Sequence, residues 1–158
     1  MSNTRRMDEI AEHLAALISG DGRLDDNLSE MPTVYSSSPG IEDSTPPTRV
    51  YVDWMDGFTD RYEPQVKSGM TLLQLVHRIS IWWVVYNDVP ATADENFARL
   101  LDNLVLILCD SVDESGYWVN GLIESWNPRT DHPNLIETAG IRYHVGKILF
   151  RIIQEKIV

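Results

Sequence analysis

The side chains of this chain best suited to catalysis or metal binding are four scattered histidines and a few adjacent carboxylates. His77 and His144 fall in segments predicted to be strands, and two strand histidines can meet across a sheet and hold a metal ion. Histidines with a purely structural role are much commoner, so we prefer that interpretation. Neighbouring acids such as Asp25 and Asp26 lie in predicted loops, and adjacency does not provide the separation that paired catalytic carboxylates need.

The recognisable catalytic motifs are missing from the sequence. It contains no nucleophile elbow, no phosphate-binding glycine loop, no cysteine pair at metal spacing and no HExxH helix. The acidic segment 21–30 also lacks the alternating oxygens, central glycine and final glutamate of a calcium loop. We therefore predict a protein that is not an enzyme and that uses no metal or cofactor.

The length and charge of the chain narrow its class further. Its 158 residues suit one domain, 1–158, that can bury a single core without disulfide bonds or structural metals. The formal net charge of −11 argues against a protein that grips nucleic acid through clustered Lys and Arg. Two interpretations of the acid excess stay open: it serves solubility, or it keeps a surface near DNA without adhering to it.

The single cysteine and the hydropathy pattern indicate a cellular compartment. Cys109 excludes an internal disulfide, and its place in an apolar helical run predicts a buried, inert thiol in a reducing cytosol. No run of residues reaches the 18 or so uninterrupted apolar positions of a membrane span, and the first residues lack the apolar core of a signal peptide. We expect a soluble intracellular protein that contacts no membrane.

The strongest secondary-structure signal is a long amphipathic helix over residues 90–111. Thr92 and Glu95 have the spacing of a capping box, which is expected to fix where the helix starts, and Asp94 with Glu95 suits the positive end of the helix dipole in the first turn. Apolar residues then recur at helical spacing and form one stripe, which needs a sheet to lie on. The stripe comprises Phe97, Leu100, Leu101, Leu104 and Leu108, widened by Val105 and Ile107.

The N-terminal third predicts a second helix and a long loop. An apolar stripe over 4–19, ended by Gly20, is typical of an amphipathic helix that docks on a core. Residues 21–48 are acidic and rich in Ser and Pro, with no sustained period. Loops of this length are usually binding loops or segments that order only with a partner.

Four strands are predicted from apolar alternation. In the longest, Ile79, Ile81, Trp83 and Val85 share one face, and its apolar opposite face indicates either a central strand or a contact with another subunit. The last strand has a helix as a competitor from Lys147 onward, but its β-branched residues favour a strand. The predicted strands cover 49–54, 72–86, 117–126 and 140–153, with a linker over 55–71 and a polar connection over 127–134.

These elements give the order α-β-β-α-β-β. We expect an α+β fold: a mainly antiparallel or mixed sheet with the long helix packed on one face and the N-terminal helix beside it. All five tryptophans fall in predicted strands, which indicates either a Trp-rich core or surface aromatics that anchor protein contacts. The tryptophans are Trp54, Trp82, Trp83, Trp118 and Trp126.

The succession of elements resembles the tail terminator (tail completion) proteins of long-tailed bacteriophages. An amphipathic helix precedes a loop and a Pro-led strand, PPTRVYVDW, followed by the long strand RISIWWVVYND. The helix VPATADENFARLLDNLVLIL comes next, and two strands, GYWVNGLIESW and AGIRYHVGKILFRI, close the pattern. The resemblance covers nearly the whole chain and rests on this pattern, since the family has no catalytic signature.

The resemblance implies a non-enzymatic virion protein at the head–tail junction, assembled in the host cytoplasm. It would form a homohexameric ring that caps the tail tube, ends its polymerisation and joins the tail to the neck or head-completion protein, while DNA passes through without specific binding. Subunits would meet through edge strands and apolar residues, and acidic side chains would line the channel. The interface candidates are Met31, Val34, Tyr35, Trp82 and Tyr86, and the channel candidates are Asp25, Asp26, Asp56, Asp60, Asp113 and Glu114.

Two other functions stay open on the sequence. The chain could be another head–tail connector or neck protein of a phage, which would join assembled heads instead of tails. It could also be a small acidic cytosolic chaperone or adaptor that binds a peptide in an apolar groove and forms dimers, never closed rings. The mass of the native assembly separates the ring from the adaptor.

Overall fold

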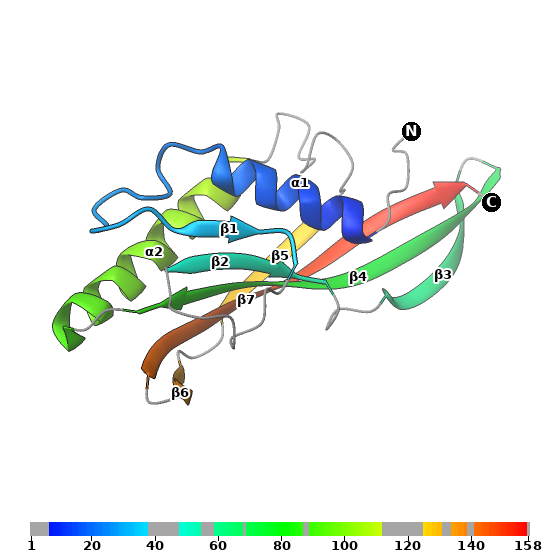
Figure 1. Cartoon of the computed structure of the whole chain (residues 1–158). Coiled ribbons are helices and arrows are strands. Elements are labelled where there is room, and N and C mark those ends of the chain that lie inside the picture. The colour runs from blue at the N-terminus through cyan, green and yellow to red at the C-terminus, as the bar shows by residue number, and fades with distance from the viewer. Residues whose placement is uncertain are drawn as a thin grey trace.

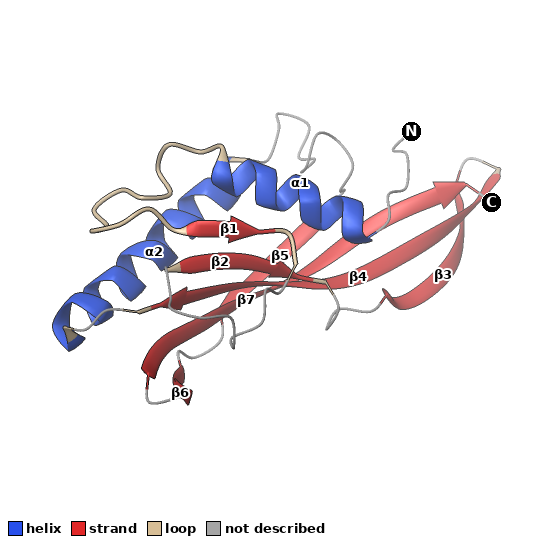
Figure 2. Ribbon diagram, in the orientation of Figure 1, coloured by secondary structure: helices blue, strands red, loops and turns tan. Residues whose placement is uncertain are grey.

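The computed structural model describes residues 7–37, 48–54, 59–67, 69–86, 89–111, 125–130, 134–138 and 141–157 (Figures 1 and 2). It shows an α+β fold in which a mixed sheet carries two helices, as predicted. The expected order of elements was wrong, because three strands were missed. The elements are α1 (Met7–Ser19), β1 (Thr33–Tyr35), β2 (Arg49–Asp53), β3 (Thr59–Lys67), β4 (Met70–Val85), α2 (Pro90–Asp110), β5 (Ser125–Thr130), β6 (Asn134–Thr138) and β7 (Ile141–Ile157).

The sheet is built around the antiparallel pair of β4 and β7. Its described strands follow the order β1-β2-β4-β7-β5, with β3 also paired to β4 and β6 also paired to β7. The β4–β7 register runs from Leu72 opposite Ile157 to Val85 opposite His144. Among the described strand pairs only β1 and β2 are parallel, which makes the sheet mixed.

One face of the sheet carries both helices and the main core. The alternation predicted for β4 is confirmed, because its odd-numbered residues from Ile79 to Val85 are buried in that core. Helix α1 packs over β1 and β2, and α2 packs over β4 and β7 (Figure 1). The largest fully buried side chains of this core are Trp83, Ile10, Leu14, Ile18, Leu24, Ile79, Ile81, Leu100, Leu104 and Ile107.

Helix α2 begins earlier than the capping box predicts. Its N-cap is Val89, which has extended backbone angles and makes no side-chain cap, and Pro90 occupies the start of the helix. Proline is pre-organised for the first helical position, since its φ is fixed and it has no N–H group to satisfy. Thr92 already lies inside the first turn, so the predicted box with Glu95 is wrong as the start of this helix.

The stripe of α2 also differs from the prediction at its edge. Cys109 is exposed, so the expected buried thiol is wrong, and Val105 is 41% exposed. Leu104 and Leu108 face the core, and each following residue is rotated by about 100° around the helix axis. Both Val105 and Cys109 therefore lie beyond the buried stripe.

The segment between α1 and β2 is partly structured. Residues 21–28 form successive tight turns, with Asn27 in the left-handed region at φ 60°, a conformation that asparagine tolerates. Strand β1, which was not predicted, follows and pairs with β2 from Thr33 opposite Arg49. The remaining residues of the predicted loop, 38–47, lie outside the described part of the chain.

The predicted linker over 55–71 is corrected by strand β3. It forms a hairpin with β4 through the turn at Gly69, whose φ of 76° favours glycine. Pro64 lies within β3, and prolines in sheets are confined to edge strands, bulges or the first residue of a strand. With the first half of β4 and the end of β7, β3 forms a ribbon that extends past the helices (Figure 1).

The last third contains a strand where a connection was predicted. Residues 127–130 belong to β5 and Asn134 begins β6, so the polar connection over 127–134 was wrong where the chain is described. The sequence 125–130 is SWNPRT. Its Asn and Pro residues favour turns, so this edge strand was not predicted here. Residues 117–124 of the predicted third strand lie outside the described residues. The last segment is a strand, as preferred over a helix.

Candidate interaction face

The sheet face opposite the helices carries a second cluster of side chains, which we call the aromatic face. Its members come from β1, β2, β4 and β7 and from Tyr86 just after β4, and the alternation of side chains along the strands turns them away from the helices. None of the described residues of α1 or α2 belongs to it. The aromatic face comprises buried Tyr51, Val84, Tyr143 and Val145, with half-buried Tyr35, Trp82 and Tyr86 packed against them.

Two ring contacts organise the aromatic face. Tyr51 of β2 lies opposite Trp82 of β4 in the strand register, and their rings stack with centroids 6.1 Å apart and planes 9° apart. Tyr86 and Tyr143 have centroids 5.9 Å apart at an interplanar angle of 46°. Such pairs add to the stabilisation that burial of their area provides. The rings form a fixed surface, of which Trp82 and Tyr86 remain partly accessible.

Cationic side chains lie over these rings. Lys147, directly opposite Trp82 in the register, places its Nζ 4.9 Å from the centroid of the indole ring. The guanidinium carbon of Arg49 lies 5.6 Å from the centroid of Tyr143. Arg78 shares the side of β4 on which Trp82 lies and is exposed. Among the described residues, basic side chains thus gather beside these rings, with Asp53 as an acid on the same side of β2.

Arg49 is the most unusual residue of this face. It is only 4% exposed, and its Nε and Nη2 atoms have no hydrogen-bond acceptor within the part of the chain that the structure describes. The indole Nε1 of Trp82 is likewise buried without a described acceptor. Leaving buried donors unpaired costs free energy, most of all for a charged group.

The opposite side of the protein is acidic. Helix α1, the turns over 21–28 and helix α2 form the helical layer, in which Arg23 and Arg99 are the only Lys or Arg of the ranges 7–30 and 89–111. Its exposed acids include Asp25, Asp26 and Asp102. Basic side chains beside the aromatic face and exposed acids of the helical layer thus lie on opposite sides of one sheet.

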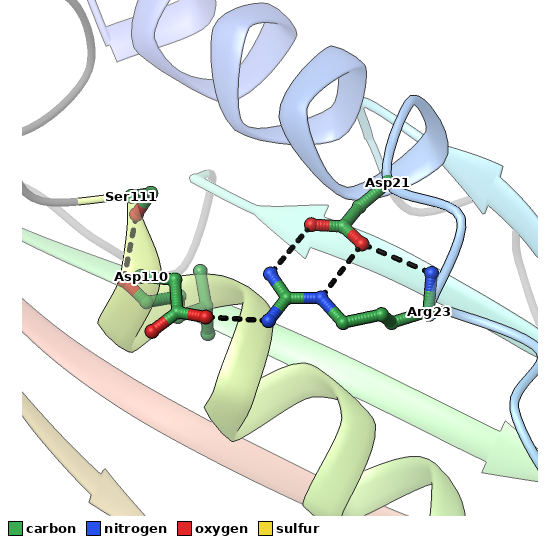
Figure 3. Close-up of polar contacts among 5 residues, drawn as sticks. Asp21, Arg23, Asp110 and Ser111 are labelled. Atoms are coloured by element: carbon green, nitrogen blue, oxygen red, sulfur yellow. Dashed lines mark hydrogen bonds and ion pairs between the residues drawn. The ribbon is translucent and has the colours of Figure 1, made fainter.

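Arg23 illustrates how this protein satisfies a guanidinium. Its Nε and Nη2 donate to the two oxygens of Asp21 at 3.0 and 2.8 Å, and its Nη1 donates to Asp110 at the end of α2 (Figure 3). These side-chain hydrogen bonds, followed by the bond from the backbone N–H of Arg23, hold the pKa of Asp21 below its ordinary value. The same two carboxylates raise the pKa of Arg23.

The structure brings together some of the predicted interface residues. Tyr35, Trp82 and Tyr86 all belong to the aromatic face. Met31, just before β1, is 53% exposed. Val34 is turned to the other side of the sheet and packs against the main core, away from the three aromatic residues.

The predicted channel residues are not brought together among the described residues. Asp25 and Asp26 are exposed in the turns after α1. Asp60 lies in strand β3, for which only the backbone and its pairing are described. The other three acids, Asp56, Asp113 and Glu114, lie outside the described residues.

Sequence reasoning missed Arg49 and Tyr143 as members of the site. The position of each residue along its strand could have indicated this. Both alternate with residues that face the main core, so their side chains are expected on the opposite face. The two strand histidines do not meet, because His77 lies opposite Ile152 and His144 opposite Val85. His144 lies on the helix side, where its Nε2 is 2.6 Å from Oδ1 of Asp94.

Neither the arrangement nor the comparisons point to a reaction. The described residues contain no group of three or more side chains placed to hold a metal ion. No helix within the described ranges combines the length and apolar character needed to cross a membrane. No family model matches the chain, and its sequence finds no match among curated proteins. The aromatic face presents ring side chains and a buried arginine, residue types that are enriched at protein interfaces.

Proposed function

We propose that this chain is a structural protein that works by associating with copies of itself. The observation that carries the proposal is the aromatic face, where Trp82 and Tyr86 stay partly accessible beside Arg49, whose buried Nε and Nη2 have no acceptor among the described residues. Aromatic residues and arginine are enriched at the centres of protein interfaces. A rigid sheet that presents them at fixed positions needs little ordering when it binds.

The charge distribution supports a head-to-tail association. The aromatic face carries Arg49 and Lys147, whereas the helical layer on the other side of the sheet carries many exposed acids. Two different, complementary surfaces produce heterologous contacts, which form a closed ring when the rotation between subunits closes. A ring is the assembly that stops at a defined number of copies.

The particular role proposed is that of the tail terminator of a long-tailed bacteriophage. The sequence segments that resemble this family motivate it, and the α+β fold with a mixed sheet supports it at a coarse level. The succession of elements supports it less, because strands β1, β3 and β6 interrupt the predicted order. In this role a homohexameric ring caps the tail tube, ends its polymerisation and joins the tail to the neck or head-completion protein of the virion. DNA passes through an acidic channel without specific binding.

Native mass spectrometry tests the assembly. We expect a dominant species near six times the 18.0 kDa mass of one chain, and a ring in negatively stained electron micrographs. A chain that stays monomeric or stops at a dimer at high micromolar concentration would contradict the ring and favour the peptide-binding adaptor.

Tube assembly tests the role itself. The purified ring, mixed with the polymerising tail tube protein of the same virus, should halt tube growth and be seen at one tube end. Tubes that lengthen at an unchanged rate would contradict the terminator role. Binding to isolated heads instead of tails would identify another connector of the head–tail junction.

A further inference from the structure

The ribbon of β3, β4 and β7 has one face on which apolar residues predominate. Directly paired residues lie on the same face of a sheet. The β4–β7 register is unbroken, so the face of β4 that enters the main core at Ile79 can be followed along the strand into the ribbon. We call it the ribbon face. Its apolar positions, assigned by pairing and alternation, include Tyr62, Pro64, Leu73, Leu75 and Ile152.

The helices of the same chain lie over the other end of the sheet. Phe97 of α2 stacks on Trp83, and Asp94 meets His144, both close to the end of β4 that is farthest from the ribbon. Helix α1 packs over β1 and β2 (Figure 1). Within the described ranges no helix covers the ribbon face, yet an apolar sheet face needs a second layer against which it is buried.

Helix α2 has the complementary feature, an apolar flank that no sheet covers in the described part of the chain. Leu101 is half-buried, Val105 is 41% exposed and Cys109 is exposed, and steps of four residues align them along the helix. We call this line the outer flank. Arg99 and Asn103, which bind the turns over 21–28, lie on the other flank. Those acidic turns therefore remain available to the aromatic face of another copy.

Charge and length favour α2 of a second copy as the partner of the ribbon face. The residues that pairing within the ribbon places on this face include no Asp or Glu, whereas His77 and Lys156 are basic. The outer flank is bordered by the exposed acids Asp94 and Asp102. Opposite charges at a rim select which surfaces meet. Helix α2 has 21 residues and is about 31 Å long, and the eight positions of β4 over 70–77 span about 27 Å.

We infer that the ribbon face of one copy packs against the outer flank of α2 in a second copy. The inference rests on the proposed self-association and adds a contact separate from the aromatic face, which lies on the other side of the sheet. Because the two surfaces differ, each copy keeps one of each available until the ring closes. The ribbon supplies the layer that the outer flank lacks, and α2 supplies the layer that the ribbon face lacks.

Two neighbouring residues of α2 test the outer flank. Val105→Gln should weaken self-association about tenfold, measured by native mass spectrometry over a dilution series, because an apolar contact is lost. Leu106→Gln is the matched control. Leu106 is 53% exposed and lies about 100° further round the helix, so its replacement should change association by less than about twofold. Both positions are exposed in one subunit, and thermal unfolding of the dissociated variants checks that they stay folded.

Two lysines test the ribbon face. Lys156→Glu brings an acid to the acidic border of the outer flank and should weaken association about tenfold at low salt and less at high salt. Lys67 pairs with Met70, which places it on the opposite face of the ribbon. Lys67→Glu makes the same change of charge there and should weaken association clearly less.

The single cysteine reports on the outer flank without any substitution. Cys109 is exposed in the isolated chain, so a maleimide labels only this thiol. Its labelling should slow at least about tenfold when the concentration is raised from the dissociated to the assembled range, since access controls the reaction of a thiol.

The outcomes separate this contact from the self-association on which it rests. Equal association of Val105→Gln and Leu106→Gln, or a Cys109 labelling rate unchanged by assembly, overturns this inference. The proposed ring then stands, and the ribbon face belongs to a different partner. A wild-type chain that never assembles overturns the proposed ring itself.

Discussion

Trp83 and Gly146 lie directly opposite each other on β4 and β7, and the indole ring occupies the space that a side chain at position 146 would need. A Cβ atom at position 146 would overlap the six-membered ring of Trp83. Trp83 is 1% exposed and also stacks on Phe97 of α2, with centroids 5.1 Å apart. The glycine therefore lets the long helix sit close to the sheet.

We predict that Gly146→Ala destabilises the protein. The ring of Trp83 is held between Phe97 and the sheet and cannot move aside freely, and overpacking of this kind costs about 1–3 kcal/mol. Urea unfolding followed by tryptophan fluorescence measures the free energy of unfolding. Gly22→Ala is the control, because a Cβ there meets nothing within 4 Å. Equal stabilities for the two variants would contradict the packing described.

We predict that Asn103→Ala loosens the turns over residues 21–28. Asn103 is 7% exposed, and its amide donates to the carbonyl oxygens of Leu24 and Asp26. Its loss leaves these acceptors without that donor, a cost of about 1–3 kcal/mol. Hydrogen exchange of residues 21–28 should rise with the loss of stability. The exposed neighbour Leu106, changed to alanine, should shift stability by less than about 0.5 kcal/mol.

We predict an acid-dependent contribution from Asp21. Its pKa is lowered in the folded chain from the ordinary value of 3.8, chiefly by the hydrogen bonds from the Arg23 side chain. Stabilisation by the ionised form is therefore fully present above the unfolded pKa and is lost as the pH falls through the folded pKa. The stability difference between wild type and Asp21→Asn should be largest near neutral pH and shrink in acid.

Carboxyl carbon NMR measures the Asp21 effect directly. In Arg23→Gln the pKa of Asp21 should move back up toward 3.8, because the side-chain hydrogen bonds that lower it most are lost. An unchanged titration midpoint in that variant would contradict the role given to Arg23.

We predict that Val89→Asp stabilises α2. Val89 is the N-cap, is 54% exposed and makes no side-chain cap. An aspartate there can accept from the first backbone N–H groups of the helix and also interacts with its dipole, a gain of about 0.5–2 kcal/mol. Thermal unfolding checks the sign. Thr92→Ala should change stability by less than about 0.5 kcal/mol, whereas a true capping box would lose about 1 kcal/mol.

The parts of the fold that the sequence predicted are those with an unbroken apolar period. Strand β4 alternates over many residues, and α1 and α2 repeat at helical spacing, so burial and periodicity agree. Strand β1 is short, β3 contains Pro64, and β6 follows a run of turn-forming residues. Their pairing depends on a neighbouring strand rather than on their own pattern, which is why they were missed.

The candidate site was predictable only in part, for a related reason. Trp82 and Tyr86 stood out because both faces of their strand are apolar. Arg49 drew no attention, since a basic residue at the start of a strand is ordinary. Its importance comes from the register that places it beside Val84 and near the ring of Tyr143. Such a relation between distant strands cannot be obtained from local pattern.

The ribbon formed by β3, β4 and β7 is continuous with the body of the sheet. Strand β4 runs without interruption from the hairpin turn near Gly69, through the ribbon, into the body where Trp82 lies. At about 3.4 Å per residue it is roughly 50 Å long, and it pairs with β7 from Leu72 to Val85. One continuous strand, hydrogen-bonded to β7 over most of its length, therefore joins the hairpin turn to the aromatic face.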